Sequence, residues 1–108
     1  MPEDCIYGVS LNNTITPLMV RDAIVECFYS AHCADSGLGD EDPKSVKKYC
    51  TDLIINAFVK TGGDYNNPTK DSIFQVLNEL ETFSKNFRNP KIIKDHYNQI
   101  MRLVELLP

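Results

Sequence analysis

The chain has 108 residues, of which 43% are hydrophobic and 24% charged, and its formal net charge is −4. This length and composition predict one globular domain, 1–108, with a buried core, and give no sign of disorder or of a repeat array. The negative charge argues against non-specific nucleic-acid binding, which needs an excess of basic side chains to neutralise phosphates.

No run of residues approaches the roughly 20 apolar residues that a membrane-spanning helix requires, so no membrane partner is expected. The opening segment MPEDCIYGVSL lacks a basic start followed by an apolar stretch, and it therefore does not predict a secretory signal. A chain without such a signal is expected in the reducing cytoplasm, where cysteines remain free thiols. The four cysteines are Cys5, Cys27, Cys33 and Cys50.

The first predicted element is an extended segment within residues 1–15. Apolar side chains alternate there with the intervening positions, which is typical of a strand or of an extended packing segment. The alternating side chains are Cys5, Tyr7, Val9 and Leu11.

Four prolines predict where four helices begin. Proline suits the first helical position, because its fixed φ matches the helix and its missing N–H would otherwise lack an intrahelical partner. The residue before each proline is Thr, Asp or Asn, whose side chain can cap the first turn, and an apolar helical periodicity follows. Gly62-Gly63 supply a C-terminal cap for the second helix. The predicted helices are 17–33, 43–61, 68–88 and 90–107, which begin at Thr16-Pro17, Asp42-Pro43, Asn67-Pro68 and Asn89-Pro90.

Each predicted helix carries an apolar stripe. Four amphipathic helices enclose one core, so the predicted fold class is all-α, a single-domain bundle of four helices with a short extended N-terminal segment. The stripes are Val20, Ala23, Ile24, Cys27, Phe28 and Ala31; Val46, Tyr49, Cys50, Leu53 and Ala57; Ile73, Val76, Leu77, Leu80, Phe83 and Phe87; and Ile93, Tyr97, Ile100, Val104 and Leu107.

The first two predicted helices carry more apolar side chains than one core needs. A large apolar side chain left in water forgoes roughly 1.5–3 kcal/mol, so these residues predict an interface with a second copy, as a homodimer, or with another protein. The alternative is that segment 1–15 and the neighbouring helices cover these faces within one chain. The candidate interface residues are Leu18, Val25, Tyr29, Ile55 and Val59.

Lysines follow two of the helix-starting prolines, where positive charge opposes the helix dipole. In an up-down bundle, helices 43–61 and 90–107 would begin at the same end, and their free N–H groups and lysines would form a basic pole suited to an anion. The competing interpretation is that nearby carboxylates (Asp40, Glu41, Asp42 and Asp95) neutralise this pole. The candidate anion-binding residues are Lys44, Lys47, Lys48, Lys91 and Lys94.

The segment CFYSAHCADS concentrates reactive side chains. Cys27 and Cys33 are six residues apart, about 120° around a helix, so they do not face one ion while the helix continues, and no metal site is predicted. Core packing is the favoured interpretation for Cys27 and Cys50. His32 lies in the last predicted turn, where the helix dipole stabilises its charge. A phosphotransfer role is disfavoured, because Asp35 stands where such domains carry a basic residue.

No nucleophile, general base and oxyanion site occur together in a recognised spacing, and there is no Gly-rich phosphate loop. We therefore expect no catalytic residue, no cofactor and no enzymatic activity. Asp35-Ser36 is similar to the DSL motif of acyl carrier proteins, but Gly37 takes the place of its leucine. The predicted function is self-association or protein docking through helix faces, with anion binding as the alternative.

Overall fold

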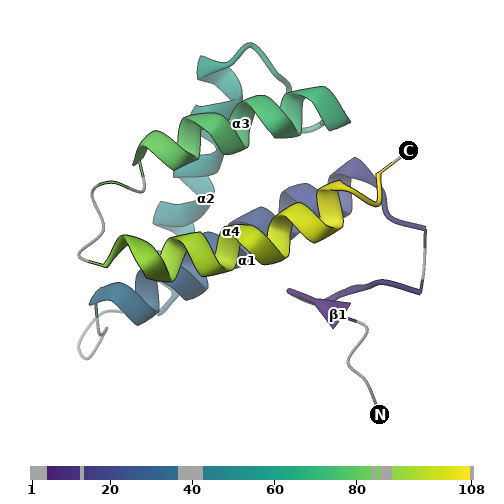
Figure 1. Cartoon of the computed structure of the whole chain (residues 1–108). Helices are drawn as coiled ribbons and strands as arrows, with labels where there is room; N and C mark the ends of the chain where they lie inside the picture. The colour runs from purple at the N-terminus through teal and green to yellow at the C-terminus, as the bar shows by residue number, and fades with distance from the viewer. Residues whose placement is uncertain (1–4, 13, 37–42, 84, 86–88, 108) are drawn as a thin grey trace.

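The computed structural model describes residues 5–12, 14–36, 43–83, 85 and 89–107. Four α-helices follow a short β-hairpin, so the predicted all-α class with an extended segment near the N-terminus is confirmed (Figure 1). No helix within these ranges is long and apolar enough to cross a membrane. The elements are β1 (Cys5–Ile6), β2 (Val9–Ser10), α1 (Pro17–Ser36), α2 (Pro43–Lys60), α3 (Lys70–Phe83) and α4 (Pro90–Val104).

Three of the four helices begin at the predicted proline. The residue before the proline caps the first turn where the structure describes it. Thr16 Oγ1 accepts a hydrogen bond from the Met19 N–H at 3.3 Å, and Asn89 Oδ1 accepts one from the Lys91 N–H at 3.1 Å. These bonds satisfy N–H groups that have no partner within the helix.

The third helix begins at Lys70 and not at Pro68, so this predicted boundary is wrong by two residues. The cause is a stronger cap just beyond the proline. Ser72 Oγ accepts a hydrogen bond from the Thr69 N–H at 2.8 Å, and Thr69 Oγ1 accepts one from the Ser72 N–H at 3.1 Å. Because this reciprocal pair closes the first turn, Thr69 acts as the capping residue and Pro68 remains outside the helix.

The helix ends differ from prediction by a few residues. α1 continues to Ser36, beyond the expected end at 33, and α4 ends at Val104, before the expected 107. α2 ends at Lys60, one residue early. The predicted end of the third helix, 84–88, lies mostly outside the described residues.

Gly62 and Gly63 close the second helix as predicted. Gly62 has a φ of +82°, a left-handed conformation that glycine adopts readily, and the Gly63 N–H donates a 2.8 Å hydrogen bond to the Phe58 carbonyl. A Cβ atom on Gly63 would lie 3.1 Å from the Ser72 Cβ atom, so the absence of a side chain also lets the start of α3 approach closely.

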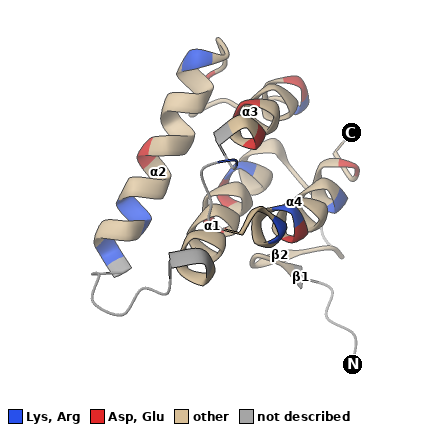
Figure 2. Ribbon diagram, turned by 60° about the vertical axis from the view of Figure 1, so that its left-hand side comes forward, with Lys and Arg blue, Asp and Glu red and all other residues tan. Residues whose placement is uncertain are grey.

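α1 is the central helix of the bundle. It packs against α4 along most of its length and also against α2 and α3, and α2 packs against α3 (Figure 1). α1 lies between α2 and α4 (Figure 2), which make no comparable contact with each other. The β1–β2 hairpin packs on α1 and α4. This arrangement leaves a groove between the hairpin, α1 and α2.

The buried apolar side chains form one cluster to which all six elements contribute. The predicted stripe of the first helix is buried throughout. The buried arc of α2 is rotated from the prediction, because Ile54 and Phe58 are fully buried whereas Tyr49 is 49% exposed. α2 therefore presents the arc centred on Cys50, Ile54 and Phe58 to the core, and Tyr49 lies against His32 with 5.8 Å between ring centroids.

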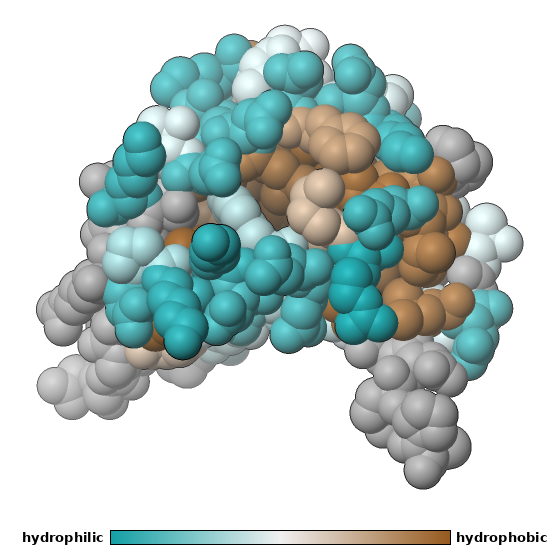
Figure 3. All heavy atoms as spheres, in the orientation of Figure 1, coloured by the Kyte–Doolittle hydropathy of each residue, from teal (hydrophilic) through white to brown (hydrophobic). Residues whose placement is uncertain are grey.

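Apolar side chains also line a hollow between α3 and α4 (Figure 3). α3 packs on α1 and α2 much more than on α4, which leaves part of the core visible from this side. The half-buried Phe74, Tyr97 and Met101 belong to these two helices. Leu106, just beyond the end of α4, is 51% exposed.

Candidate binding groove between α1 and α2

A groove of about 370 Å³ opens where the hairpin, α1, α2 and the α2–α3 connection meet. It combines aromatic, charged and apolar side chains, which is common in binding sites. The lining residues are Tyr7, Asp22, Val25, Glu26, Lys47, Thr51 and Tyr65.

The α1 side of the groove carries the first three candidate interface residues. Leu18, Asp22, Val25 and Tyr29 follow one another at spacings of four, three and four, so they share one helix face. Leu18 is 46% exposed and Tyr29 is half-buried. Val25 is only 6% exposed, because its own chain covers it, so its side chain is not available to a partner.

The α2 side carries the other two candidate interface residues. Thr51 lines the groove, and Ile55 and Val59 follow it at spacings of four along the same side of the helix. Ile55 is half-buried, whereas Val59 is 70% exposed, the most exposed large apolar side chain among the described residues. The exposed apolar residues thus lie beside the groove on two neighbouring helices.

Tyr65 closes the groove from the α2–α3 connection. The Arg21 guanidinium lies 4.3 Å from the centroid of the Tyr65 ring and donates a 2.7 Å hydrogen bond to the Tyr65 carbonyl. The Tyr65 ring also packs edge-to-face against the Phe58 ring, with 5.7 Å between the ring centroids. These contacts fix the connection against α1 and α2.

Tyr7 forms the opposite wall, at the turn between β1 and β2. Its φ of +49° is left-handed, which is uncommon for a residue other than glycine. Its hydroxyl is hydrogen-bonded to His96 Nδ1 on α4, and the centroids of the two rings are 5.9 Å apart. The hydroxyl also interacts with the Cys27 thiol on α1. The turn is therefore held by both helices of the α1–α4 pair.

Charges on the groove face are arranged in pairs. Arg21 contacts Asp22 at 2.7 Å, and Lys47 forms an ion pair with Glu26 that raises the lysine pKa. Lys48, the next residue on α2, does not line the groove, and it contacts Asp52 at 3.0 Å. Each pair is exposed enough to add little stability. Their consequence is that Asp22 and Glu26, the two carboxylates that line the groove, each contact a basic side chain of the same chain.

Two buried thiols and two partly buried phenols are not activated. Burial raises the pKa of Cys27 to about 12 and that of Cys50 to about 11. Burial also raises the pKa of Tyr97 and Tyr7 far above the ordinary value. These groups therefore stay protonated near neutral pH, and none provides the thiolate or phenolate that nucleophilic catalysis needs.

The five candidate anion-binding lysines do not form one cluster of free cations. Lys47 and Lys48 are engaged by Glu26 and Asp52, and α1 separates α2 from α4 (Figure 2). The other three, Lys44, Lys91 and Lys94, lie exposed near the starts of α2 and α4. Of the carboxylates considered as neutralising partners, Asp40, Glu41 and Asp42 lie outside the described residues.

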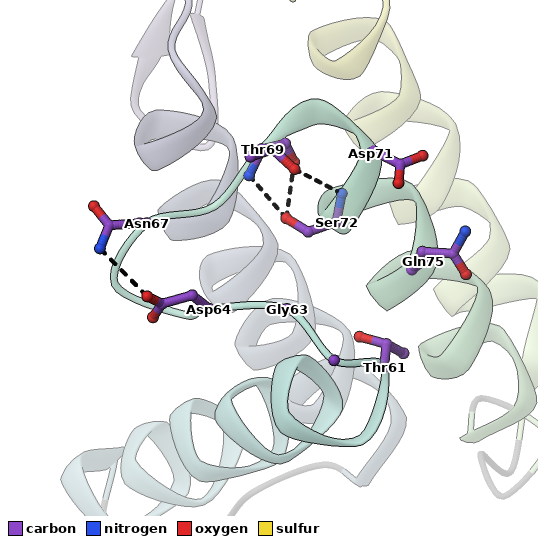
Figure 4. A pocket seen from close by; sticks show the side chains of 9 residues that line it. Thr61, Gly63, Asp64, Asn67, Thr69, Asp71, Ser72 and Gln75 are labelled. Carbon is purple, nitrogen blue, oxygen red and sulfur yellow. Dashed lines mark hydrogen bonds between the residues drawn. The ribbon is translucent and has the colours of Figure 1, made fainter.

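A second, polar pocket of about 320 Å³ lies at the α2–α3 connection (Figure 4). Its polar groups mostly bind one another. Asp64 accepts hydrogen bonds from the Asn66 N–H and the Asn67 side-chain amide, which lower its pKa, and Thr69 pairs with Ser72. These bonds shape the loop. The lining residues are Thr61, Gly62, Gly63, Asp64, Asn67, Thr69, Asp71, Ser72 and Gln75.

The sequence indicated two residues of the groove, Val25 as a candidate interface residue and Lys47 as a candidate anion-binding residue, and it did not indicate the polar pocket. Among the described residues, no three His, Cys, Asp or Glu side chains gather closely enough to hold a metal ion. Comparison with protein-family models, with curated protein sequences and with solved structures finds no match to this chain.

Proposed function

We propose that the protein functions by self-association, and that a second copy of the chain binds the face formed by α1 and α2. The observation that carries this proposal is the exposure of Leu18 and Val59, at 46% and 70%, on the faces of α1 and α2 whose Val25 and Thr51 line the groove. Half-buried Tyr29 and Ile55 lie on the same two helix faces. Burial of such side chains provides the main free-energy gain in protein association.

The charge pattern supports a second copy as the partner. Two chains that each carry −4 repel one another over long range, so a surface that self-associates must be locally neutral or self-complementary. The two carboxylates that line the groove, Asp22 and Glu26, are paired within each chain with Arg21 and Lys47. A copy of the same face can then approach it without meeting an excess of like charge.

The size of the contact sets a further requirement. A stable interface buries about 800 Å² on each partner, which exceeds what Leu18 and Val59 contribute alone. The interface we propose therefore extends over both helices and includes the groove. A two-fold arrangement suits this requirement, because each contact between two different residues then occurs twice across the interface, once from each copy.

The proposed location is a reducing compartment such as the cytoplasm. Cys27 and Cys50 are buried free thiols, and Cys33 is also a free thiol. Buried unpaired cysteines are typical of proteins that are not exposed to oxidising conditions.

Sedimentation velocity over a micromolar concentration series tests the self-association. We expect a concentration-dependent species of twice the 12.2 kDa chain mass, and we expect Val59→Asp and Leu18→Asp to dissociate it. The matched control is Leu106→Asp, which adds the same charge at a 51% exposed leucine beyond α4 and leaves the dimer intact.

A 12.2 kDa species at every concentration would contradict self-association. A dimer that Leu106→Asp dissociates while Val59→Asp and Leu18→Asp do not would place the interface elsewhere and refute the α1/α2 face. If the wild-type chain is monomeric but binds a different protein through Val59, the face is a docking site and the second copy is the wrong partner.

A further inference from the structure

Tyr65 joins the two helices of the α1/α2 face. Its ring centroid lies 4.3 Å from the Arg21 guanidinium on α1, and the ring packs edge-to-face on Phe58 of α2. Arg21 comes three residues after Leu18, and Phe58 directly precedes Val59. Tyr65 therefore lies between the part of α1 that carries Leu18 and the end of α2 that carries Val59, the two exposed residues of the proposed interface.

Side chains of both helices hold the Tyr65 ring in place. The Arg21 side chain, which is 15% exposed, contacts the ring and also donates a 2.7 Å hydrogen bond to the Tyr65 carbonyl. Arg21 is itself fixed, because its Nε and Nη2 atoms both donate to Asp22 Oδ1, at 3.1 and 2.7 Å. Phe58 packs against the ring from α2. The ring therefore has little conformational freedom left to lose when a partner contacts it.

The connection that carries Tyr65 is a hydrogen-bonded turn. Asp64, the residue before Tyr65, accepts hydrogen bonds from the Asn66 N–H at 2.9 Å and from the Asn67 side-chain amide at 3.3 Å. The Asn67 N–H also donates to the Asp64 carbonyl at 3.1 Å. These bonds join residues on both sides of Tyr65 in the chain, so its backbone is held together with its ring.

Part of the Tyr65 side chain is available to a partner. The residue is half-buried and lines the groove, and its hydroxyl has no hydrogen-bond partner among the residues that the structure describes. A tyrosine offers a large apolar ring and a polar end at a small cost in conformational entropy, because few of its torsion angles rotate freely. Tyrosine is accordingly enriched among the residues that contribute most to binding at protein interfaces.

We propose that Tyr65 is the aromatic anchor of the self-association, contacted by the second copy on the α1/α2 face, and that Arg21 is the residue that positions it. This inference rests on the proposed self-association and names the groove residue that contributes most to it. In a two-fold dimer, the contact with Tyr65 occurs twice, once in each copy. Because the Tyr65 ring is already ordered in the free chain, its contact with the partner costs little additional entropy.

Proton NMR of the wild-type chain in a dilution series tests the anchor without any substitution. We expect the Tyr65 ring resonances to shift as the dimer dissociates, because the side chains of the second copy leave the ring. The Tyr49 ring is the internal control. Tyr49 comes two residues before Thr51, which lines the groove, so it lies on nearly the opposite side of α2 and its resonances stay unchanged.

A double-mutant cycle in sedimentation velocity measures the contribution of Tyr65 and shows whether Arg21 acts through it. We expect Tyr65→Ala to raise the dissociation constant about 30-fold or more, as for a dominant interface residue, and Tyr49→Ala to leave it unchanged. Arg21→Lys should raise the dissociation constant on the order of five- to tenfold in the wild-type chain. In the Tyr65→Ala chain, Arg21→Lys should have no further effect, because the ring that it positions is absent.

The anchor is refuted if the dimer forms but Tyr65→Ala leaves its dissociation constant unchanged, or if the Tyr65 ring resonances do not shift on dilution. The positioning role is refuted if Arg21→Lys raises the dissociation constant equally in the wild-type and Tyr65→Ala chains. If Tyr65→Ala does not fold, the wild-type dilution series decides the anchor and Tyr65→Leu takes its place in the cycle. A wild-type chain that is monomeric at every concentration refutes the proposed self-association itself, which separates that failure from a failure of the anchor.

Discussion

The Arg21 guanidinium lies over the Tyr65 ring, 4.3 Å from its centroid, and donates a 2.7 Å hydrogen bond to the carbonyl of the same residue. One side chain of α1 thereby holds both the ring and the backbone of the α2–α3 connection. The Arg21 side chain is 15% exposed, so these interactions are partly shielded from water. This contact gives the groove a rigid end wall.

Arg21→Lys is expected to destabilise the protein by about 1–2 kcal/mol. Lysine keeps the charge, but it lacks the planar guanidinium that stacks on the ring while it donates to the carbonyl. Urea unfolding followed by circular dichroism measures the change. Arg102→Lys, at an exposed position on α4, is the control, and its effect should stay within about 0.5 kcal/mol. Equal effects of the two substitutions would show that the Tyr65 contact adds no stability.

Tyr97→Phe is expected to stabilise the protein by about 1 kcal/mol. The Tyr97 hydroxyl oxygen is buried and has no hydrogen-bond partner among the described residues, so it forfeits its hydration without compensation. Phenylalanine keeps the ring, whose centroid lies 6.2 Å from that of Phe28. Thermal and urea unfolding provide the measurement, with Tyr49→Phe at a half-exposed ring as the control. A loss of stability in Tyr97→Phe would mean that the hydroxyl has a hydrogen-bond partner and would contradict the expectation.

The cysteines are expected to differ strongly in reactivity. With a pKa near 12, about one Cys27 thiol in 10,000 is ionised at pH 8, and for Cys50, with a pKa near 11, the ionised fraction is about one in 1,000. Iodoacetamide should therefore label the half-buried Cys33 first, in a Cys5→Ser background, as peptide mass spectrometry can show. Cys27 and Cys50 should react only on unfolding.

These thiols also predict how stability responds to alkali. Their pKa values are raised above the ordinary 9.0, so the folded state holds its protons more tightly than the unfolded state. Their contribution is therefore complete below about pH 9 and is lost progressively above it. Cys27→Ala should reduce this alkaline loss of the free energy of unfolding. An unchanged pH profile in that variant would contradict the assignment.

Much of the secondary structure followed from the sequence, because helix starts depend on local chemistry. Thr16 and Asn89 each precede a proline and cap the helix that it begins, as predicted. The same rule placed the third start two residues early, because the Thr69–Ser72 pair provides a better cap just beyond Pro68. The correct helix starts and the misplaced one all depend on residues a few positions apart, and such short-range relationships can be read from the sequence.

The groove was harder to predict from the sequence than the helix starts were. The excess of apolar side chains on the first two helices indicated a surface there, and Leu18 and Val59 are exposed beside the groove. Helical periodicity could not tell that Val25, on the same face as Leu18, is covered by its own chain. It also assigned Tyr49 to the core, although packing rotates α2 so that Phe58 is buried instead.

The sequence by itself determined which segments become helices and which faces of them are apolar, because capping, proline geometry and periodicity act over a few residues. Only the tertiary structure decided which of those faces remain open and which polar groups meet. Tyr7 and His96 are 89 positions apart in the chain, and no local pattern joins them. Their hydrogen bond exists because the hairpin packs on α1 and α4, and long-range packing of this kind depends on the whole core rather than on any one segment.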